Sequence, residues 1–173
     1  MKILSLDLSS KSSGYAIFED KQLIDYGCIT AGSANLFKRI EKMTQELELI
    51  LQKYPDIKHV YIEDVYPEDV HHNIQIYKAL TYLQGEVLHL LDKYNLNNTF
   101  FTASEWRAKC GIRTGQGVKR ESLKPKDIAF VRNQFNLQVN DDVADAICIG
   151  FAAVGGEIKN PQTIITDDGF EFA

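Results

Sequence analysis

The sequence predicts an α/β domain in which a five-stranded mixed sheet is flanked by helices. Three observations support this fold class. Three short apolar segments open the chain, two longer segments show apolar residues at helical spacing, and short apolar runs alternate with helical segments afterwards. This alternation is typical of a sheet covered by helices. At 173 residues the chain fits one domain and is long enough to bury a substantial core.

The N-terminal part of the chain predicts three strands in succession. Alternating apolar residues indicate a strand over 2–8, and two more strands are expected over 15–18 and 23–29. A polar turn is expected between the second and third strands, near 19–21. Consecutive strands with short connections favour an antiparallel meander.

A long amphipathic helix is predicted over 35–54, where Pro55 ends it, and a strand follows over 58–63. The apolar stripe of this helix consists of Leu36, Ile40, Met43, Leu47, Ile50 and Tyr54.

A second long helix is predicted over 71–94, and its apolar surface is broader than contact with one sheet requires. Its apolar stripe consists of Ile76, Leu80, Leu83, Val87, Leu90 and Tyr94, broadened by Tyr77, Leu88 and Leu91. A homodimer interface would explain the excess, and a central position in the core is the alternative. Gly85 is costly in mid-helix and indicates a close backbone approach there.

The second half of the chain predicts one more strand and three more helices. In chain order we expect a strand over 98–102, a short helix over 104–109 with Ser104 as its N-cap, a basic loop over 111–125, and helices over 126–136 and 140–154. Gly155 and Gly156 end the last helix. We therefore expect a domain over 1–156 and an acidic, partly ordered tail over 157–173.

The charge of the chain is unevenly distributed. The net charge is −5, yet eight cationic side chains between Ser104 and Arg132 face three acidic ones, a net +5 that leaves −10 for the remainder. This distribution favours a polyanionic partner at the basic stretch, and a solvated charged face is the alternative. The three scattered cysteines lack metal-ligand spacing and indicate reduced thiols. No apolar run is long enough to span a membrane, and no secretion signal is recognisable.

Four acidic residues stand at three separate structural junctions. Asp7 ends the first predicted strand, Glu63 ends the fourth, and Asp142 and Asp145 lie near the start of the last helix. Carboxylates close to a core are costly unless a cation compensates them. Gathered together, they suit hard cations such as Mg²⁺, which prefer oxygen ligands. The pattern predicts metal-ion chemistry on phosphate.

The order of elements and acids resembles the ribonuclease H-like fold, and within it the Holliday junction resolvases of the RuvC type. The motifs that carry the resemblance are Asp7-Leu-Ser-Ser-Lys-Ser-Ser-Gly14-Tyr, Tyr61-Ile-Glu63-Asp-Val-Tyr66 and Asp142-Val-Ala-Asp145-Ala-Ile. Ser104-Glu-Trp-Arg107 followed by a basic loop is similar to the phage-type branch of that family. The resemblance covers roughly residues 1–154.

The resemblance implies a structure-selective DNA endonuclease that works as a homodimer and resolves branched DNA by paired nicks leaving 5′-phosphates. It implies that Asp7, Glu63, Asp142 and Asp145 are catalytic metal ligands. Two Mg²⁺ ions per active site are expected, with Mn²⁺ as a substitute. We expect the protein in the cytoplasm of a bacterial host cell, encoded by a phage or a similar mobile element.

Two positions in these motifs have close competitors. Helical spacing does not choose between Asp141 and Asp142. Asp142 lies three residues before Asp145 and Asp141 lies four before it, so either can share a helix face with Asp145. The family pattern favours Asp142. Strand alternation directs Glu63 and Asp64 to opposite faces, so only one of them can join Asp7, and the family pattern favours Glu63.

Aromatic and basic residues are predicted to contact DNA. The candidates are Tyr66, Arg113, Lys119, Arg120, Lys124 and Lys126. Lys126 best matches the family's catalytic lysine, and Lys124 is close enough to compete.

Other functions are compatible with parts of the pattern. A ribonuclease H-type nuclease on RNA/DNA hybrids would share the fold and the metals, and a junction-binding protein without catalysis would not need the complete acid set. A nucleotide-binding module of the actin or sugar-kinase type would need two such domains, for which the chain is too short. Gly115-Gln-Gly117-Val-Lys119 has the wrong spacing for a P-loop, so no nucleotide cofactor is expected.

Overall fold

The structure of the chain is a computed structural model that describes residues 1–66, 73–115, 118 and 122–158. Five strands and five helices lie within these residues. In chain order they are β1 (Lys2–Asp7), β2 (Ser12–Glu19), β3 (Gln22–Thr30), α1 (Leu36–Lys53), β4 (Ile57–Glu63), α2 (Ile74–Lys93), β5 (Asn97–Phe101), α3 (Ala103–Lys109), α4 (Leu123–Phe135) and α5 (Asp141–Ala153). The predicted α/β class is confirmed.

The five strands form one mixed sheet in the order β3-β2-β1-β4-β5. The first three strands are antiparallel to one another, as the short turns between them predict, while β1, β4 and β5 are parallel. Because β1 and β4 are parallel neighbours paired through Leu6 and Ile62, their last residues lie at the same edge of the sheet. Asp7 and Glu63 are those last residues.

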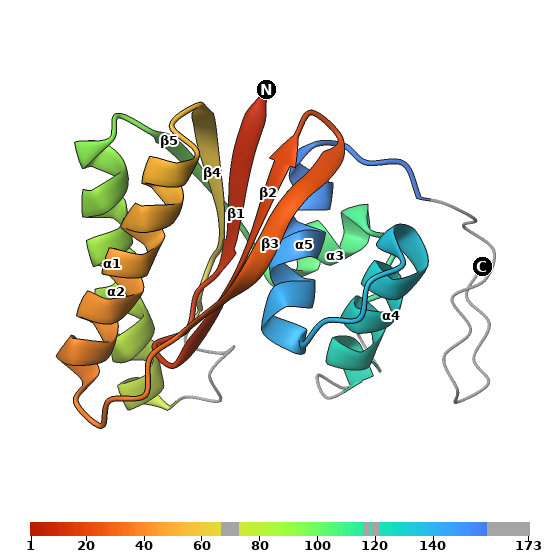
Figure 1. Cartoon of the computed structure of the whole chain (residues 1–173). Coiled ribbons are helices and arrows are strands. Elements are labelled where there is room, and N and C mark those ends of the chain that lie inside the picture. The colour runs from red at the N-terminus through yellow and green to blue at the C-terminus, as the bar shows by residue number, and fades with distance from the viewer. Residues whose placement is uncertain (67–72, 116–117, 119–121, 159–173) are drawn as a thin grey trace.

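Helices cover both faces of the sheet and enclose two hydrophobic cores. Helices α1 and α2 pack on one face, and α3, α4 and α5 pack on the other (Figure 1). Leu47 and Leu83 belong to the first core, and Trp106 and Ile147 belong to the second. Burial of such apolar side chains is the main favourable term in folding.

Helix α5 lies unusually close to the sheet. A Cβ atom added to Gly14 on β2 would stand 1.9 Å from the backbone oxygen of Asp142, so only glycine fits at this contact. Further along the helix, the Ser5 hydroxyl of β1 donates to the Ala146 carbonyl at 2.7 Å. The start of α5 is therefore held against the strand next to β1, where Asp7 pairs with Gly14.

Two predicted helix starts are wrong. Helix α3 is capped by Thr102 rather than Ser104, because Thr102 and Glu105 form a reciprocal capping box. Helix α4 begins at Leu123 rather than at residue 126. Pro125 lies in its first turn, where backbone N–H groups have no partner inside the helix, so a proline is tolerated there.

Two expectations for α2 also need revision. The helix begins at Ile74 with Asn73 as its cap, and residues 71 and 72 lie outside the described residues. The close backbone approach predicted at Gly85 is not found, since no described atom lies within 4 Å of a Cβ built there.

The predicted acidic tail falls almost entirely outside the described residues, which end at Ile158. The Gln134 side chain donates to the Glu157 backbone oxygen at 2.8 Å, so the tail's first residue packs on α4. None of the helices in the described ranges has both the length and the apolar character needed to cross a membrane.

Candidate active site

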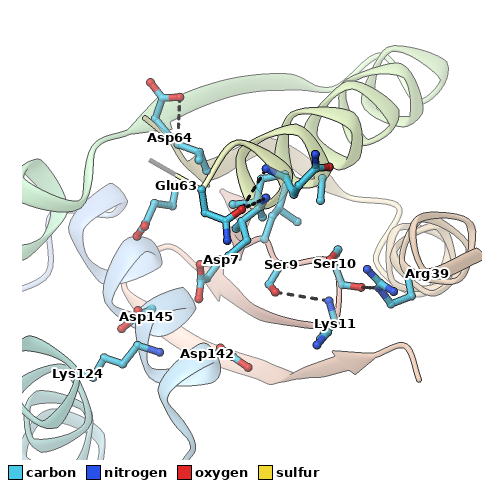
Figure 2. A pocket seen from close by; sticks show the side chains of 17 residues that line it. Asp7, Ser9, Ser10, Lys11, Arg39, Glu63, Asp64, Lys124, Asp142 and Asp145 are labelled. Atoms are coloured by element: carbon cyan, nitrogen blue, oxygen red, sulfur yellow. Dashed lines mark hydrogen bonds between the residues drawn. The ribbon is translucent and has the colours of Figure 1, made fainter. Parts of the chain in front are cut away.

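A hollow of about 710 Å³ opens at the edge of the sheet where β1 and β4 end. All four predicted acidic residues line it: Asp7, Glu63, Asp142 and Asp145. Figure 2 shows the carboxylates of Asp7, Asp142 and Asp145 around this space, with Lys124 beside them. Residues from opposite ends of the described chain thus meet in one place.

The elements of the fold bring these carboxylates together for simple geometric reasons. Asp7 and Glu63 are neighbours because parallel strands end at the same edge. Asp142 and Asp145 are three residues apart on α5 and therefore share one face of that helix. The contact between Gly14 and the Asp142 backbone places that face next to Asp7.

Burial and mutual repulsion disfavour ionisation of Asp7 and Asp145. Burial raises the pKa of Asp7 well above its ordinary value, and the negative charges of Glu63 and Asp142 raise it further. Burial also raises the pKa of Asp145, with contributions from the charges of Asp7 and Asp127. A cation bound among these carboxyl groups would favour their ionised forms, and such perturbed pKa values mark a candidate functional site.

A buried ion pair lies directly behind the acidic residues. Arg107 of α3 is only 8% exposed, and its side chain donates to Asp127 of α4, from Nε to Oδ2 at 3.0 Å and from Nη2 to Oδ2 at 2.8 Å. The same Nη2 lies 3.6 Å from Oδ2 of Asp145. Arg107 therefore compensates part of the negative charge at Asp145.

Two neutral donors hold the other acidic side chains. The indole Nε1–H of Trp106 donates to Oε2 of Glu63 at 2.8 Å. The Ser12 hydroxyl donates to Oδ2 of Asp142 in a short hydrogen bond. The sequence pattern assigns no role at the site to Trp106, Ser12 or Asp127, because each contacts a residue far away in the chain.

The structure places the close competitors differently. Asp142 lines the hollow, while Asp141 accepts a short hydrogen bond from Lys124 Nζ. Figure 2 shows the carboxylate of Asp64 directed away from Asp7, and it accepts a hydrogen bond from the Val65 backbone N–H at 2.9 Å. Lys124 lines the hollow and Lys126 does not, which favours Lys124 of the two competing lysines. The cause is the earlier start of α4, which moves Lys124 into its first turn.

The chemistry of the site fits a divalent cation. Oδ1 of Asp145 is buried and has no hydrogen-bond partner among the described residues, which is costly for a carboxylate oxygen unless a cation can reach it. Acidic oxygens are the donors that hard cations prefer. Within the part of the chain that the structure describes, no three acidic, histidine or cysteine side chains stand close enough together to form a ready metal cage.

The comparisons with known proteins agree with this geometry. Residues 3–153 match the family model of the crossover junction endodeoxyribonuclease RuvC. The chain belongs to the RuvC family. It is accordingly a crossover junction endodeoxyribonuclease, and RuvC proteins depend on divalent metal ions. No curated protein sequence matches the chain significantly.

Solved structures of RuvC-type resolvases share the fold. A Thermus thermophilus RuvC in complex with a Holliday junction substrate aligns with a TM-score of 0.72 and 11% identity, covering 90% of this chain and 94% of that one. The yeast mitochondrial Holliday junction resolvase Ydc2 aligns with a TM-score of 0.59 and 12% identity, covering 88% and 78%. The predicted ribonuclease H-like fold is confirmed, and the phage-type branch stays a prediction.

The residues predicted to contact DNA are spread more widely than the four acidic residues of the hollow. Tyr66 is 45% exposed, and Arg113 is exposed as well, but neither lines the hollow. Lys119 and Arg120 lie outside the described residues. Two cations that the sequence pattern did not single out, Lys11 and Arg39, do line it. Lys11 lies inside the first motif, shortly after Asp7, and this position is a signal that could have found it.

The pKa shifts predict opposite pH dependence for two aspartates of the site in the metal-free protein. The raised pKa of Asp7 means that its stabilising contribution is complete below the ordinary value of 3.8 and is lost as the pH rises through the folded-state value. In EDTA, Asp7→Asn should therefore raise the free energy of unfolding relative to the native chain, increasingly so as the pH rises from 3.8 through the raised folded-state pKa. Urea denaturation across this range measures the difference.

Asp141→Asn is the matched control, because the hydrogen bond from Lys124 lowers the pKa of Asp141. A lowered pKa contributes stability above 3.8 that is lost as the pH falls, so this variant should not be stabilised at about pH 8. A parallel response of both variants to pH would contradict the electrostatic account of the site.

Proposed function

We propose that this RuvC-family endonuclease cuts four-way DNA junctions by paired nicks that leave 5′-phosphates, with Asp7, Glu63, Asp142 and Asp145 holding two Mg²⁺ ions. Bound divalent cations lower the pKa of an attacking water and stabilise the charge of the leaving 3′ oxygen. A four-way junction suits this chain because the matched Thermus thermophilus RuvC holds a Holliday junction substrate in its complex.

One observation carries the proposal more than any other. The carboxyl group of Asp145 is buried, its pKa is raised, and its Oδ1 has no partner among the described residues, although Asp7 stands close enough to repel it. Maintaining such a group costs stability, and a binding site for cations explains why the fold maintains it.

The side chains at the hollow can be assigned roles in metal binding, transition-state stabilisation and phosphate binding. Asp7 lies on the central strand of the sheet and would hold the ions from a rigid support. Lys124 stands at the mouth of the same hollow, where its charge can stabilise the negative charge that develops on the phosphate. Lys11 and Arg39 line another part of it and can hold a flanking phosphate of the strand.

Replacement of one metal ligand should separate catalysis from binding. Asp7→Asn should abolish cleavage of a synthetic four-way junction with Mg²⁺ or Mn²⁺, because it would remove a negatively charged oxygen from the proposed set of metal ligands. Junction binding in a gel-shift assay with Ca²⁺ should remain nearly unchanged, since phosphate contacts come from other residues. Fork, flap and RNA/DNA hybrid substrates tested beside the junction define the selectivity.

Absence of any cleavage by the native chain under these conditions would refute the proposed activity. Preferential cutting of the hybrid would instead assign the site to ribonuclease H-type chemistry. Loss of junction binding in Asp7→Asn would contradict the role of Asp7 as a metal ligand.

The two competing lysines can be compared directly. Lys124→Ala should lower the single-turnover cleavage rate by about 10²-fold, the typical effect of removing one group that stabilises transition-state charge. Lys126→Ala removes the same charge two residues away on the same helix and should retain most of the rate. Equal losses in both variants would indicate a shared phosphate-binding role instead.

We propose further that the protein acts as a homodimer through α1 and α2. Phe37 of α1 is 69% exposed and stacks on Tyr82 of α2, which is 48% exposed, with 6.2 Å between ring centroids. The two rings line a groove of about 520 Å³ that also contains Gly85. Exposed apolar surface with an open glycine beside it suits a second copy of the chain and supports the paired nicks.

A charge introduced into the groove should break this dimer. Phe37→Glu should give a monomer by light scattering at concentrations at which the native chain is a dimer, since burying an unpaired carboxylate at an interface is costly. Leu49→Glu changes another exposed apolar residue of α1 outside the groove and should leave the dimer intact. A native chain that is monomeric at high concentration would contradict the proposal.

A further inference from the structure

The single tryptophan of the chain directs its polar group at a proposed metal ligand. Trp106 is fully buried, and its Nε1–H donates to Oε2 of Glu63 at 2.8 Å across 43 positions of sequence. A buried indole needs an acceptor for this N–H, and a carboxylate is the strongest kind of acceptor. The bond therefore joins the core of the α3–α5 layer to the acidic site.

We infer that Trp106 is a positioning residue that holds the Glu63 carboxylate in the orientation required for cation binding. The inference rests on the proposed metal-binding role of Glu63. The backbone of Glu63 is already fixed, because Gln84 donates to its carbonyl at 3.2 Å and the next residue pairs with Phe101. The side-chain torsions of Glu63 are not fixed by these bonds, and Trp106 acts on them.

The electrostatics of the site explain why such a donor is needed. Glu63 and Asp7 end neighbouring parallel strands and carry like charges when ionised, so repulsion favours a Glu63 side chain turned away from the cluster. The indole N–H opposes that movement. It is also uncharged, so it holds the carboxylate without replacing the cation that the cluster attracts, as a lysine or arginine at the same place would.

The donor itself is rigidly supported. The guanidinium of Arg107 lies 4.1 Å from the centroid of the Trp106 ring, and Arg107 is fixed in turn by its buried ion pair with Asp127. The capping box at Thr102 fixes the start of α3 one turn before Trp106. The short helix α3 thus presents one neutral donor and one cation to the back of the acidic site.

A near-isosteric replacement isolates the N–H group. Because Trp106 is the only tryptophan, growth of a tryptophan auxotroph on β-(3-benzothienyl)alanine replaces this residue alone and exchanges N–H for sulfur while retaining the bicyclic shape. The full chain with this replacement should bind Mn²⁺ about tenfold more weakly by calorimetry, the lower end of the usual effect of losing an outer-shell partner. Its melting temperature without metal should stay close to that of the native chain.

Genetic variants provide a second measurement. Trp106→Phe should raise the Mg²⁺ concentration needed for half-maximal junction cleavage about tenfold, with much of the rate recovered at saturating Mg²⁺. Phe130→Leu truncates another buried aromatic residue of the same core, one that packs on Phe151, so it should lower stability without changing the Mg²⁺ requirement.

Unchanged Mn²⁺ affinity in the benzothienyl protein would overturn the inference, even if Trp106→Phe fails to fold. An equal shift of the Mg²⁺ requirement in Phe130→Leu would overturn it as well, because the effect would then follow from lost packing. A native chain that binds no Mn²⁺ would overturn the proposed metal site together with this inference, an outcome distinct from the first two.

Discussion

The close contact between helix α5 and the sheet is the constraint on which the site depends. Because Gly14 has no side chain, the Asp142 backbone can pack directly against β2, and the Ser5 hydroxyl donates to the same helix further along. Without this approach, Asp142 and Asp145 would stand too far from the strand ends to share a cation with Asp7. A glycine on a neighbouring strand is therefore as necessary to the geometry as the acids themselves.

Close packing of the carboxyl groups is electrostatically unfavourable, and Arg107 of α3 offsets part of this cost. Burial raises the pKa of Asp7 and of Asp145. Arg107 reaches Asp145 from behind, but its stronger bonds go to Asp127, so most of its charge is already compensated. The cluster consequently retains an excess of negative charge toward the hollow, which is the property that a cation site requires.

Sequence patterns predict the site residues whose positions follow from local spacing. They miss the residues whose contacts join distant parts of the chain. The strand ends at Asp7 and Glu63 and the helical spacing of Asp142 and Asp145 are local, and the structure brings all four side chains to one hollow. The position of Lys124 depends on where α4 begins, and Pro125 obscures that start because a first turn tolerates proline. The bonds from Trp106 to Glu63 and from Arg107 to Asp127 leave no periodic signal, because they join separate elements.

Helix α2 connects the proposed dimer interface to the proposed active site. Ala79 and Leu80 line the acidic hollow, while Thr81, Tyr82 and Gly85 line the groove that also contains Phe37. A helix packs as a rigid unit, so a second copy seated in the groove would also fix the wall of the hollow. Two sites ordered by one interface would favour two incisions over one, which is the requirement for resolving a junction symmetrically. Under this proposal, the apolar surface of α2 serves the dimer interface and the wall of the hollow in addition to the core, to which Leu83, Val87 and Leu91 belong.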